Sequence, residues 1–394
     1  MTSALPRYDA INLAGKAILM RVDFNIPPDA HGNLADTYRL EAHLPGIKEL
    51  LAKGARLGLL THRGRPQGDV VPHLSTKPLA EELSRQLGQA VHHVPDCIGR
   101  MAEQAMAELP PGQVLLFENT RFHLGEQVND AAFVRHLAKL GEVFVNDAFA
   151  AAHRPHASMS GLAATMPTSV LGPLMLRELD WLQTLQADAP RPLSCIIGGT
   201  QVAAKLDLIA ALMTRVDTLM LAGAVAHTFL ASRDMGLGRS LLDPGSVERA
   251  RDIFAEAGVV GCRLLLPQDF TVQNKQDGTV TAKPFNKLSG DDMAMDIGPQ
   301  TCETWRQVIG KSARSFWLGS VGNFEHSPFD TGCRTVAEGL LAAEGFTLAA
   351  GDGLLKALKP DAMRTRLPHV SSGAAVWLHA LAGKPLPALQ VLRR

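Results

Sequence analysis

Short apolar runs alternate with longer amphipathic stretches along the whole chain of 394 residues, and this alternation restricts the fold more than any other feature. Each run has the length of a strand and ends in a polar or glycine-containing turn. Strands that alternate with helices pair in parallel through right-handed crossovers, so we predict an α/β protein with doubly wound, Rossmann-like parallel sheets. The predicted strands lie at 17–24, 56–61, 114–118, 143–148, 193–197, 218–222, 262–266, 315–318 and 346–349.

The alternation occurs once in each half of the chain, which predicts two domains. A long periodic stretch at 172–186 separates the halves and is followed by Ala-Asp-Ala-Pro-Arg-Pro at 187–192. Amphipathic stretches such as 39–53, 76–87 and 247–258 supply helices between the strands. We therefore expect a first domain at 1–171, a connecting helix at 172–187, a second domain at 188–375 and a C-terminal tail at 376–394.

The composition excludes several classes of protein. Lys+Arg and Asp+Glu are equal at 39 each, so no global basic field predicts a nucleic-acid or membrane partner. The five cysteines are odd in number and form no Cys-x-x-Cys pair, so neither a disulfide framework nor a zinc site is indicated. The N-terminus lacks the apolar core of a signal peptide, and no apolar run reaches ~18 residues. We expect a reduced, cytoplasmic protein.

Arginines and histidines follow the predicted strands of the first half. Because the carboxyl ends of parallel strands meet at one edge of a sheet, these side chains are expected to converge. Guanidinium groups bind phosphate and carboxylate through paired hydrogen bonds, so the set predicts a small, multiply anionic substrate. A single such residue is more often a solvated loop arginine, but the set as a whole is harder to explain in that way. The arginines are Arg21, Arg39, Arg65, Arg121 and Arg154.

Small residues follow the predicted strands of the second half. At 196–205 the sequence is Ile-Ile-Gly-Gly-Thr-Gln-Val-Ala-Ala-Lys, a strand that breaks into a glycine turn before a helix carrying Lys205. Backbone N–H groups, a helix N-terminus and a nearby cation can hold a phosphate, although an ordinary βα turn would look the same. The other strand ends are also rich in glycine, and carboxylates stand at Glu325 and Asp352. This combination predicts a nucleotide site with a carboxylate for magnesium.

Two familiar nucleotide motifs are absent from the sequence. The tripeptide Gly-Lys-Ser at 310–312 has Trp305 where a Walker A motif requires glycine. The Gly-Asp-Gly sequence at 351–353 is followed by Leu-Leu-Lys and does not complete Gly-x-Gly-x-x-Gly. The sequence therefore gives little support to a P-loop enzyme or an NAD-linked dehydrogenase.

Several long motifs resemble phosphoglycerate kinase, and they occur in the order of that family across essentially the whole chain. In the first half these are Arg-Val-Asp-Phe-Asn-Ile-Pro (21–27), Thr-His-Arg-Gly-Arg-Pro (61–66), Glu-Asn-Thr-Arg-Phe-His (118–123) and Val-Asn-Asp-Ala-Phe-Ala-Ala-Ala-His-Arg-Pro-His-Ala-Ser (145–158). In the second half they are Leu-Pro-Gln-Asp-Phe (266–270), Asp-Ile-Gly-Pro-Gln-Thr (296–301), Gly-Asn-Phe-Glu (322–325) and Gly-Lys-Pro-Leu-Pro (383–387).

The resemblance implies an enzyme, a phosphotransferase of glycolysis that moves a phosphoryl group reversibly between ATP and the carboxylate of 3-phosphoglycerate. Arg39 would lie near the reacting carboxyl group, Glu325 at the ribose and Asp352 at Mg²⁺ bound with ATP or ADP. The catalytic residues would be Arg39, Lys205 and Gly351. The 3-phosphoglycerate site would comprise Asp23, Asn25, Arg39, His62, Arg65, Arg121 and Arg154. The nucleotide site would comprise Gly198, Gly199, Lys205, Gly223, Gly298, Gly319, Glu325, Asp352 and Gly353.

The resemblance also implies a monomer with two half-sites on separate domains, which bind small molecules and no nucleic acid or membrane. Hinge bending at 172–186 and 371–373 would close the two domains over the ligands and exclude water from the acyl phosphate. The C-terminal tail would return to the first domain.

The second half departs from the family pattern around the expected nucleotide. Gln201 stands where the family has a lysine, and Ala224 where it has a glycine. Ala349 and Ala350 replace two glycines before Gly351, and Ala374 and Ala375 shorten a late triple glycine. Removing one preorganised donor that stabilises charge typically lowers turnover about 10²–10³-fold. The alternative to an active kinase is therefore a catalytically weakened paralogue that binds 3-phosphoglycerate or nucleotide in a regulatory or assembly role. A third possibility is a kinase for another small phosphorylated acid.

Overall fold

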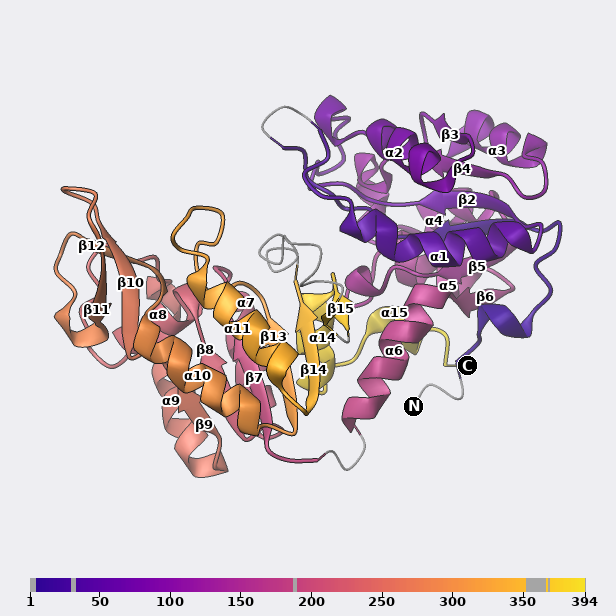
Figure 1. Ribbon diagram of the computed structural model, residues 1–394. Helices are drawn as coiled ribbons and strands as arrows, with labels where there is room; N and C mark the ends of the chain where they lie inside the picture. Colours follow the sequence, from indigo (N-terminus) through magenta and orange to yellow (C-terminus); the bar gives the residue numbers. More distant parts are fainter. Residues whose placement is uncertain (1–4, 30–32, 187–189, 352–365, 368, 394) are drawn as a thin grey trace. The chain divides into compact units, whose positions relative to one another are not determined.

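The computed structural model describes residues 5–29, 33–186, 190–351, 366–367 and 369–393 (Figure 1). These residues form two compact units. Unit 1 comprises residues 1–187 and 385–394, and unit 2 comprises residues 188–384. Residues 376–384, which the sequence analysis assigned to the C-terminal tail, thus group with unit 2. Across the described ranges, no helix is long and apolar enough to cross a membrane.

Unit 1 is built on a parallel sheet of six strands in the order β3-β4-β2-β1-β5-β6. The strands are β1 (Ala17–Arg21), β2 (Arg56–Leu60), β3 (Val91–Val94), β4 (Val114–Phe117), β5 (Val143–Asn146) and β6 (Ser169–Leu171). The helices are α1 (Tyr38–Ala52), α2 (Lys77–Leu87), α3 (Gly99–Glu108), α4 (Ala131–Ala138), α5 (Leu162–Thr165), α6 (Pro173–Gln186) and α15 (Pro387–Gln390). Helix α15 follows unit 2 in the sequence, and its Ala388 N–H donates to the carbonyl oxygen of Ala152 in unit 1.

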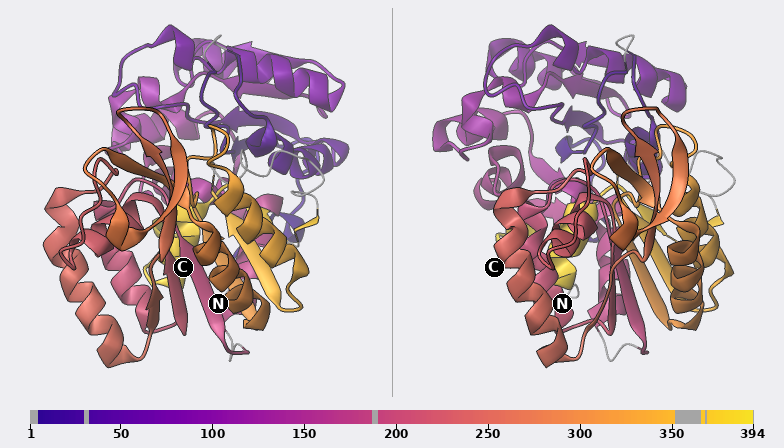
Figure 2. Two further views of the ribbon diagram at one scale, coloured as in Figure 1. Left: turned by 60° about the vertical axis from the view of Figure 1, so that its left-hand side comes forward. Right: turned by 90° about the vertical axis from the view of Figure 1, so that its left-hand side faces the viewer.

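Unit 2 is built on a second parallel sheet of six strands in the order β15-β14-β13-β7-β8-β9. These strands are β7 (Leu193–Ile197), β8 (Thr218–Leu221), β9 (Arg263–Leu265), β13 (Arg314–Leu318), β14 (Phe346–Ala350) and β15 (Val370–Ser371). The helices are α7 (Ala203–Met213), α8 (Gly223–Ala231), α9 (Val247–Val260), α10 (Pro299–Lys311), α11 (Thr331–Ala342) and α14 (Ala374–Leu381). Helix α9 lies on one side of the strands and α10 and α11 lie on the other, as the right-hand view of Figure 2 shows. The prediction of doubly wound parallel sheets is therefore confirmed.

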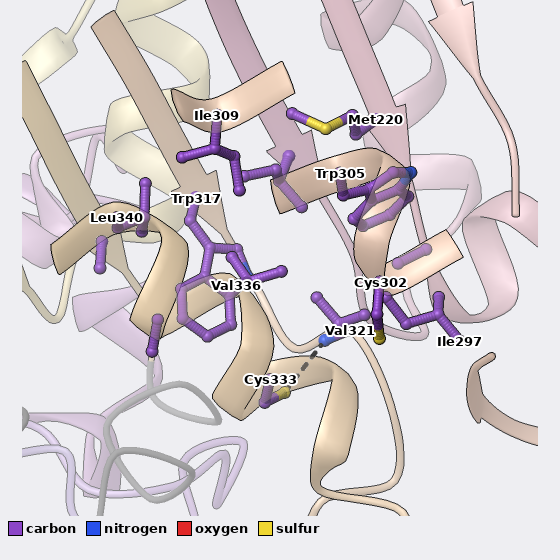
Figure 3. Packing of buried hydrophobic residues seen from close by; sticks show 14 of the residues in the cluster. Met220, Ile297, Cys302, Trp305, Ile309, Trp317, Val321, Cys333, Val336 and Leu340 are labelled. Atoms are coloured by element: carbon purple, nitrogen blue, oxygen red, sulfur yellow. Dashed lines mark hydrogen bonds between the residues drawn. The ribbon is translucent and has the colours of Figure 1, made fainter. Parts of the chain in front are cut away.

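A buried cluster fixes one face of the unit 2 sheet. Trp305 and Ile309 of α10 pack with Val336 of α11 against Trp317 of β13, and all four side chains are buried (Figure 3). The Sγ atom of Cys333 accepts a hydrogen bond from the Val321 N–H at 3.4 Å, which attaches the loop after β13 to α11. This packing holds the carboxyl end of β13 in a fixed position beside β7.

Several strands were not predicted from the sequence. Strands β3, β6 and β15 are short, and their apolar runs are too brief to stand out. Unit 2 also contains an antiparallel sheet in the order β11-β10-β12, formed by β10 (Asp269–Asn274), β11 (Val280–Pro284) and β12 (Asp292–Ile297). Strand β11 is mostly exposed and carries no apolar run, so it offers no strand signal in the sequence. The predicted first strand also extends too far, because β1 ends at Arg21.

Candidate active-site clusters in the two units

In each parallel sheet the strand order changes direction at one point, and most of the described candidate residues of that unit lie near it. In unit 1 this point lies between β1 and β5, and in unit 2 it lies between β7 and β13. Ligands of open α/β sheets bind outside the carboxyl ends of the strands at such points. We describe the two clusters separately, beginning with unit 1.

Arg21 and His62 form the buried floor of the unit 1 cluster. The Arg21 Nη2 atom lies 2.8 Å from His62 Nδ1, and Arg21 Nε donates to Ser158 Oγ at 2.8 Å. Because a guanidinium group only donates, His62 Nδ1 accepts, and the neutral ring carries its proton on Nε2. Burial, followed by the charges of Arg121 and Arg21, holds the pKa of His62 well below its usual value. Glu126 balances the buried charge by accepting hydrogen bonds from the N–H (2.9 Å) and hydroxyl (2.6 Å) of Ser158.

Asp23 and Asn25 lie on the loop that leaves β1. Asp23 is buried and forms an ion pair with Arg39 of α1, and its Oδ1 lies 4.0 Å from His62 Nδ1. Burial disfavours the charged carboxylate, but the surrounding cations, Arg39 first among them, outweigh that effect and lower the pKa of Asp23. Asn25 Oδ1 accepts the N–H of Gly64 at 2.8 Å, which joins this loop to the loop after β2. The predicted residues at 23, 25, 39 and 62 are thus neighbours.

Arg121 and Arg154 add further positive charge to the same cluster. Arg121 is buried, and its Nη1 donates to the carbonyl oxygen of Gly64 at 2.6 Å. Burial lowers the pKa of Arg121 to about 10, with further contributions from Arg154 and Arg21. Its Nε atom is buried and has no hydrogen-bond acceptor within the described part of the chain. A donor left unsatisfied among cations is an unfavourable arrangement that a bound anion would relieve.

Arg65 differs from the other predicted arginines because its side chain is exposed. Its charge still acts on the cluster. The pKa of Arg154 is lowered mainly by burial, and the positive charge of Arg65 lowers it further. His156 also faces these cations, and burial together with Arg121 and Arg154 lowers its pKa to about 3. The other six residues predicted for the anionic substrate thus lie in the unit 1 cluster, Arg65 is related to it through its charge, and the cations outnumber the carboxylates.

Gly198 and Gly319 bring the carboxyl ends of β7 and β13 into direct contact in unit 2. A Cβ atom added to Gly198 would lie 1.9 Å from the carbonyl oxygen of Ser320, so no side chain fits there. Gly319 has a φ of +86°, and an added Cβ would lie 2.9 Å from the carbonyl oxygen of Gly198. The close approach explains both glycines, which leave the backbone groups of the turn without covering side chains.

Lys205 and the remaining glycines complete the unit 2 cluster. Lys205 Nζ donates to the carbonyl oxygen of Gly198 at 2.7 Å and lies 3.1 Å from the Cβ position of Gly199. Gly223 begins α8, and its Cβ position lies 3.2 Å from the backbone nitrogen of Gly199. Gly351 follows β14, and its Cβ position lies 3.4 Å from the backbone nitrogen of Gly319. One cation, two helix N-termini and several bare peptide groups thus occupy one sheet edge, an arrangement that binds phosphate.

Burial lowers the pKa of Lys205 to about 8. A negatively charged phosphate beside Nζ would favour the protonated amine and reverse this shift. The lysine is therefore able to gain electrostatic stabilisation when an anion binds.

Two predicted nucleotide residues have a different structural setting. Gly298 precedes α10, and an added Cβ would lie 2.3 Å from the carboxylate of Asp269. That carboxylate accepts the N–H groups of Gln300 and Thr301 at 3.0 and 2.8 Å, so the helix N-terminus already has its anion. Glu325 is exposed on the loop between β13 and α11. Neither residue is joined to the Gly198–Lys205 contact by a described hydrogen bond, and their roles stay predictions.

Asp352 and Gly353 lie outside the described residues. The donors described at the unit 2 edge are peptide groups and an amine, which fit phosphate oxygens rather than a magnesium ion. The substitutions noted in the sequence are described: Gln201 is exposed before α7, Ala224 is buried in the first turn of α8, and Ala374 begins α14. The Cβ atom of Ala374 lies 3.5 Å from the Cβ position of Gly351, which narrows the edge there.

Among the described residues, one group of side chains has the types and spacing of metal ligands: Asp96, Cys97 and His123. Each offers one ligand atom, and these atoms lie within 4.8 Å of one another. His123 Nε2 and Asp96 Oδ1 lie 2.8 Å apart, and the same oxygen accepts the N–H of Cys97 at 2.6 Å. These contacts satisfy the aspartate without an ion, so we interpret the group as a brace for the loop after β3.

Sequence reasoning missed two buried residues beside Asp23. His43 and Asp147 are hydrogen-bonded to each other at 2.8 Å, and His43 also contacts the Asp23 backbone. The signal was present in the sequence, because His43 stands four residues after Arg39 on one predicted helix face. Asp147 was part of a quoted motif but had no assigned role.

The fold and the two clusters define a class of protein, a two-unit α/β phosphotransferase with a cationic edge on one sheet and a glycine-lined edge on the other. Comparison with known sequences is specific: the family model for phosphoglycerate kinase matches residues 8–384. The chain belongs to the phosphoglycerate kinase family.

Individual relatives agree with this assignment. Phosphoglycerate kinase from Moorella thermoacetica is 40% identical over 384 residues, with 97% of each chain covered. The enzyme from Granulibacter bethesdensis is 39% identical over 391 residues, with 98% of each covered. Among solved structures, phosphoglycerate kinase from Coxiella burnetii superposes with a TM-score of 0.81 at 30% identity, and that from Pyrococcus horikoshii with 0.87 at 27%, each over 98% of both chains. The resemblance predicted from the motifs is confirmed.

Proposed function

We propose that this chain is an ATP-dependent phosphoglycerate kinase, which catalyses the reversible transfer of a phosphoryl group between ATP and the carboxylate of 3-phosphoglycerate in glycolysis. The observation that supports this function most strongly is the pair of complementary clusters on the family's fold. One gathers cations around the unsatisfied Arg121 Nε, and the other gathers peptide groups around Lys205. Identity near 40% to curated kinases over the full length favours this function over a non-catalytic paralogue.

The reaction needs positioning more than acid–base chemistry. The substrate carboxylate is already ionised at neutral pH, so no residue has to remove a proton. Its oxygen forms a bond to the γ-phosphorus of ATP as the bond to the ADP oxygen breaks, and charge spreads over the transferred phosphoryl oxygens. Fixed cations and N–H groups stabilise that charge without reorganising during the reaction.

The unit 1 cluster would bind 3-phosphoglycerate. Arg121 and Arg154 suit its phosphate, and the Nε2–H inferred for His62 adds a neutral donor. Arg39, which Asp23 holds in place, would approach the reacting carboxyl group. Arg65 is exposed and would contribute mainly its charge.

The unit 2 cluster would bind the nucleotide phosphates through Lys205 and the turns at Gly198-Gly199 and Gly223. Gly319 and Gly351 leave room for the transferring group, and Gly298, Glu325, Asp352 and Gly353 would complete the site. Mg²⁺ bound with ATP would neutralise charge on the phosphate oxygens, with Asp352 as its protein contact. We also propose that the chain acts as a cytoplasmic monomer and that bending at the 172–186 connector and at 371–373 brings the two ligands together.

The direct test is to incubate the purified protein with 3-phosphoglycerate and MgATP in the presence of hydroxylamine, which converts an acyl phosphate into a coloured hydroxamate. We expect hydroxamate that depends on both substrates. Absence of product, combined with calorimetric binding of 3-phosphoglycerate, would refute the kinase and support the weakened paralogue. Turnover with a different phosphorylated acid in place of 3-phosphoglycerate would support the third possibility.

The exposed Gln201 offers a second test of the same function. It stands at the family's lysine position and supplies no charge, so Gln201→Lys should raise turnover at least about tenfold if charge at this position limits the reaction. Gln201→Met is the matched control of similar length and should give no increase. An unchanged rate in Gln201→Lys would show that the lost charge does not limit turnover.

A further inference from the structure

His43 and Arg39 reach the same residue from one face of α1. They stand four positions apart, a spacing that places two side chains on the same side of a helix. Arg39 pairs with the carboxylate of Asp23, and His43 Nε2 lies 3.1 Å from the Asp23 backbone nitrogen. The helix therefore holds Asp23 at two places, its carboxylate and its peptide N–H.

The hydrogen bonds of His43 determine its tautomer. A backbone N–H can only donate, so Nε2 must accept and carries no proton. The neutral ring then has its proton on Nδ1, which lies 2.8 Å from Asp147 Oδ2. Phe24 packs edge-on against the imidazole, with ring centroids 5.5 Å apart and planes at 78°. The ring is thus fixed by one acceptor, one donor and one aromatic contact.

Asp147 connects this arrangement to the first turn of α6, the helix that leads toward unit 2 in the sequence. Its Oδ1 accepts the N–H of Met175 at 3.0 Å. Gly172 lies so close that an added Cβ would be 2.5 Å from the same oxygen. Asp147 is fully buried, so a displaced His43 would leave its Oδ2 without this donor. A continuous buried chain of contacts runs from α6 through Asp147, His43 and Asp23 to Arg39.

We propose that His43 is a positioning residue for the anionic substrate of the unit 1 cluster. By accepting the Asp23 N–H, it fixes the peptide from which the Asp23 carboxylate extends, and through that carboxylate it sets the direction of the Arg39 guanidinium group. Without this acceptor, the buried N–H of Asp23 must find another partner, and the Asp23–Arg39 pair must move with it. The identity of the ligand, 3-phosphoglycerate, is taken from the proposed function, and the inference rests on that function to this extent.

Three substitutions separate the two hydrogen bonds of His43. His43→Ala removes both. His43→Asn retains a donor near the position of Nδ1, toward Asp147, but supplies no acceptor for Asp23. His43→Gln places an acceptor near the position of Nε2 and loses the donor to Asp147. The exposed histidine of β3 provides the matched control, His92→Ala, in the same unit.

We expect His43→Ala and His43→Asn to raise the KM for 3-phosphoglycerate about tenfold. A tenfold change corresponds to about 1.4 kcal/mol, which is the typical contribution of one hydrogen bond. His43→Gln should stay within about twofold of the wild type. The KM for MgATP should be unchanged in every variant, because unit 1 holds the altered cluster. A general structural defect would not produce this split or its partial rescue by glutamine.

The inference is overturned if folded His43→Asn binds 3-phosphoglycerate as tightly as the wild type, if both KM values rise together, or if His43→Gln is no better than His43→Asn. Thermal denaturation establishes whether each variant is folded, and the asparagine–glutamine comparison stands even if the alanine variant unfolds. A wild type without turnover would refute the proposed function alone. In that case calorimetry replaces the KM measurement: the dissociation constant for 3-phosphoglycerate must rise in His43→Ala and His43→Asn and stay near the wild-type value in His43→Gln.

Discussion

Arg121 provides the sharpest test of the cationic cluster, because the structure predicts that removing it weakens ligand binding without destabilising the protein. The fall of its pKa to about 10 corresponds to about 2–3 kcal/mol against the charged form. Arg121→Met also removes the hydrogen bond to the Gly64 carbonyl oxygen, at a cost of about 1 kcal/mol. The variant should therefore be about as stable as the wild type or up to about 2 kcal/mol more stable.

The binding of 3-phosphoglycerate should change in the opposite direction. A charge-assisted pair with the phosphate contributes about 1.5–3 kcal/mol, so the dissociation constant should rise at least about tenfold. Urea denaturation with and without 3-phosphoglycerate measures both effects, and the ligand should stabilise the wild type more than the variant. Arg100→Met, at an exposed arginine of α3, is the matched control and should change neither quantity. A variant that binds 3-phosphoglycerate normally, or that loses more than about 2 kcal/mol of stability without ligand, would refute this account of the cluster.

Three further predictions follow from other contacts. Gly198→Ala should cost at least about 3 kcal/mol of stability and abolish stabilisation by MgATP in thermal melts, because its Cβ would meet a backbone oxygen at 1.9 Å; a normal melting temperature would contradict the close packing of β7 and β13. Lys205 loses its charge as pH rises through about 8 in the free protein, so kcat/KM for MgATP should fall above that pH in the wild type and stay level in Lys205→Arg; identical pH profiles would exclude Lys205 as the source. Burial raises the pKa of Asp296 to about 7, so the folded state binds the additional proton and stability should fall by about 4 kcal/mol as pH rises from about 4 to 7; urea titrations of Asp296→Asn should lack this slope.

The fold could be predicted largely because its strands are buried on both faces. Strand β7 is buried along its whole length, is apolar apart from Ser194 and ends in a glycine turn, so its predicted and observed limits agree. Strand β11 is paired on one side and exposed, and its residues carry no apolar signal. The three strands of the antiparallel sheet are neighbours in the sequence, but β11 is held by its backbone pairing with β10, which the pattern of apolar residues does not reveal.

The candidate clusters could be predicted to different degrees. Arg121 and His62 follow strands whose order places them at one sheet edge, so motif and topology were sufficient to bring them together. Gly298 shows the limit of a motif, since its tight fit against Asp269 is visible only in three dimensions. The four-residue spacing places His43 on one helix face with Arg39, but its contact with the Asp23 peptide could not be predicted, because a backbone partner leaves no trace in the side-chain pattern.

Phosphoryl transfer from ATP to the carboxylate of 3-phosphoglycerate is the central claim, and ³¹P NMR of the purified protein with both substrates and Mg²⁺ tests it directly. We predict that the γ-phosphorus signal of ATP decreases while signals of ADP and of an acyl phosphate appear, and that neither change occurs without 3-phosphoglycerate. ATP that stays intact, or that is converted to ADP and free phosphate at the same rate without 3-phosphoglycerate, would contradict the claim.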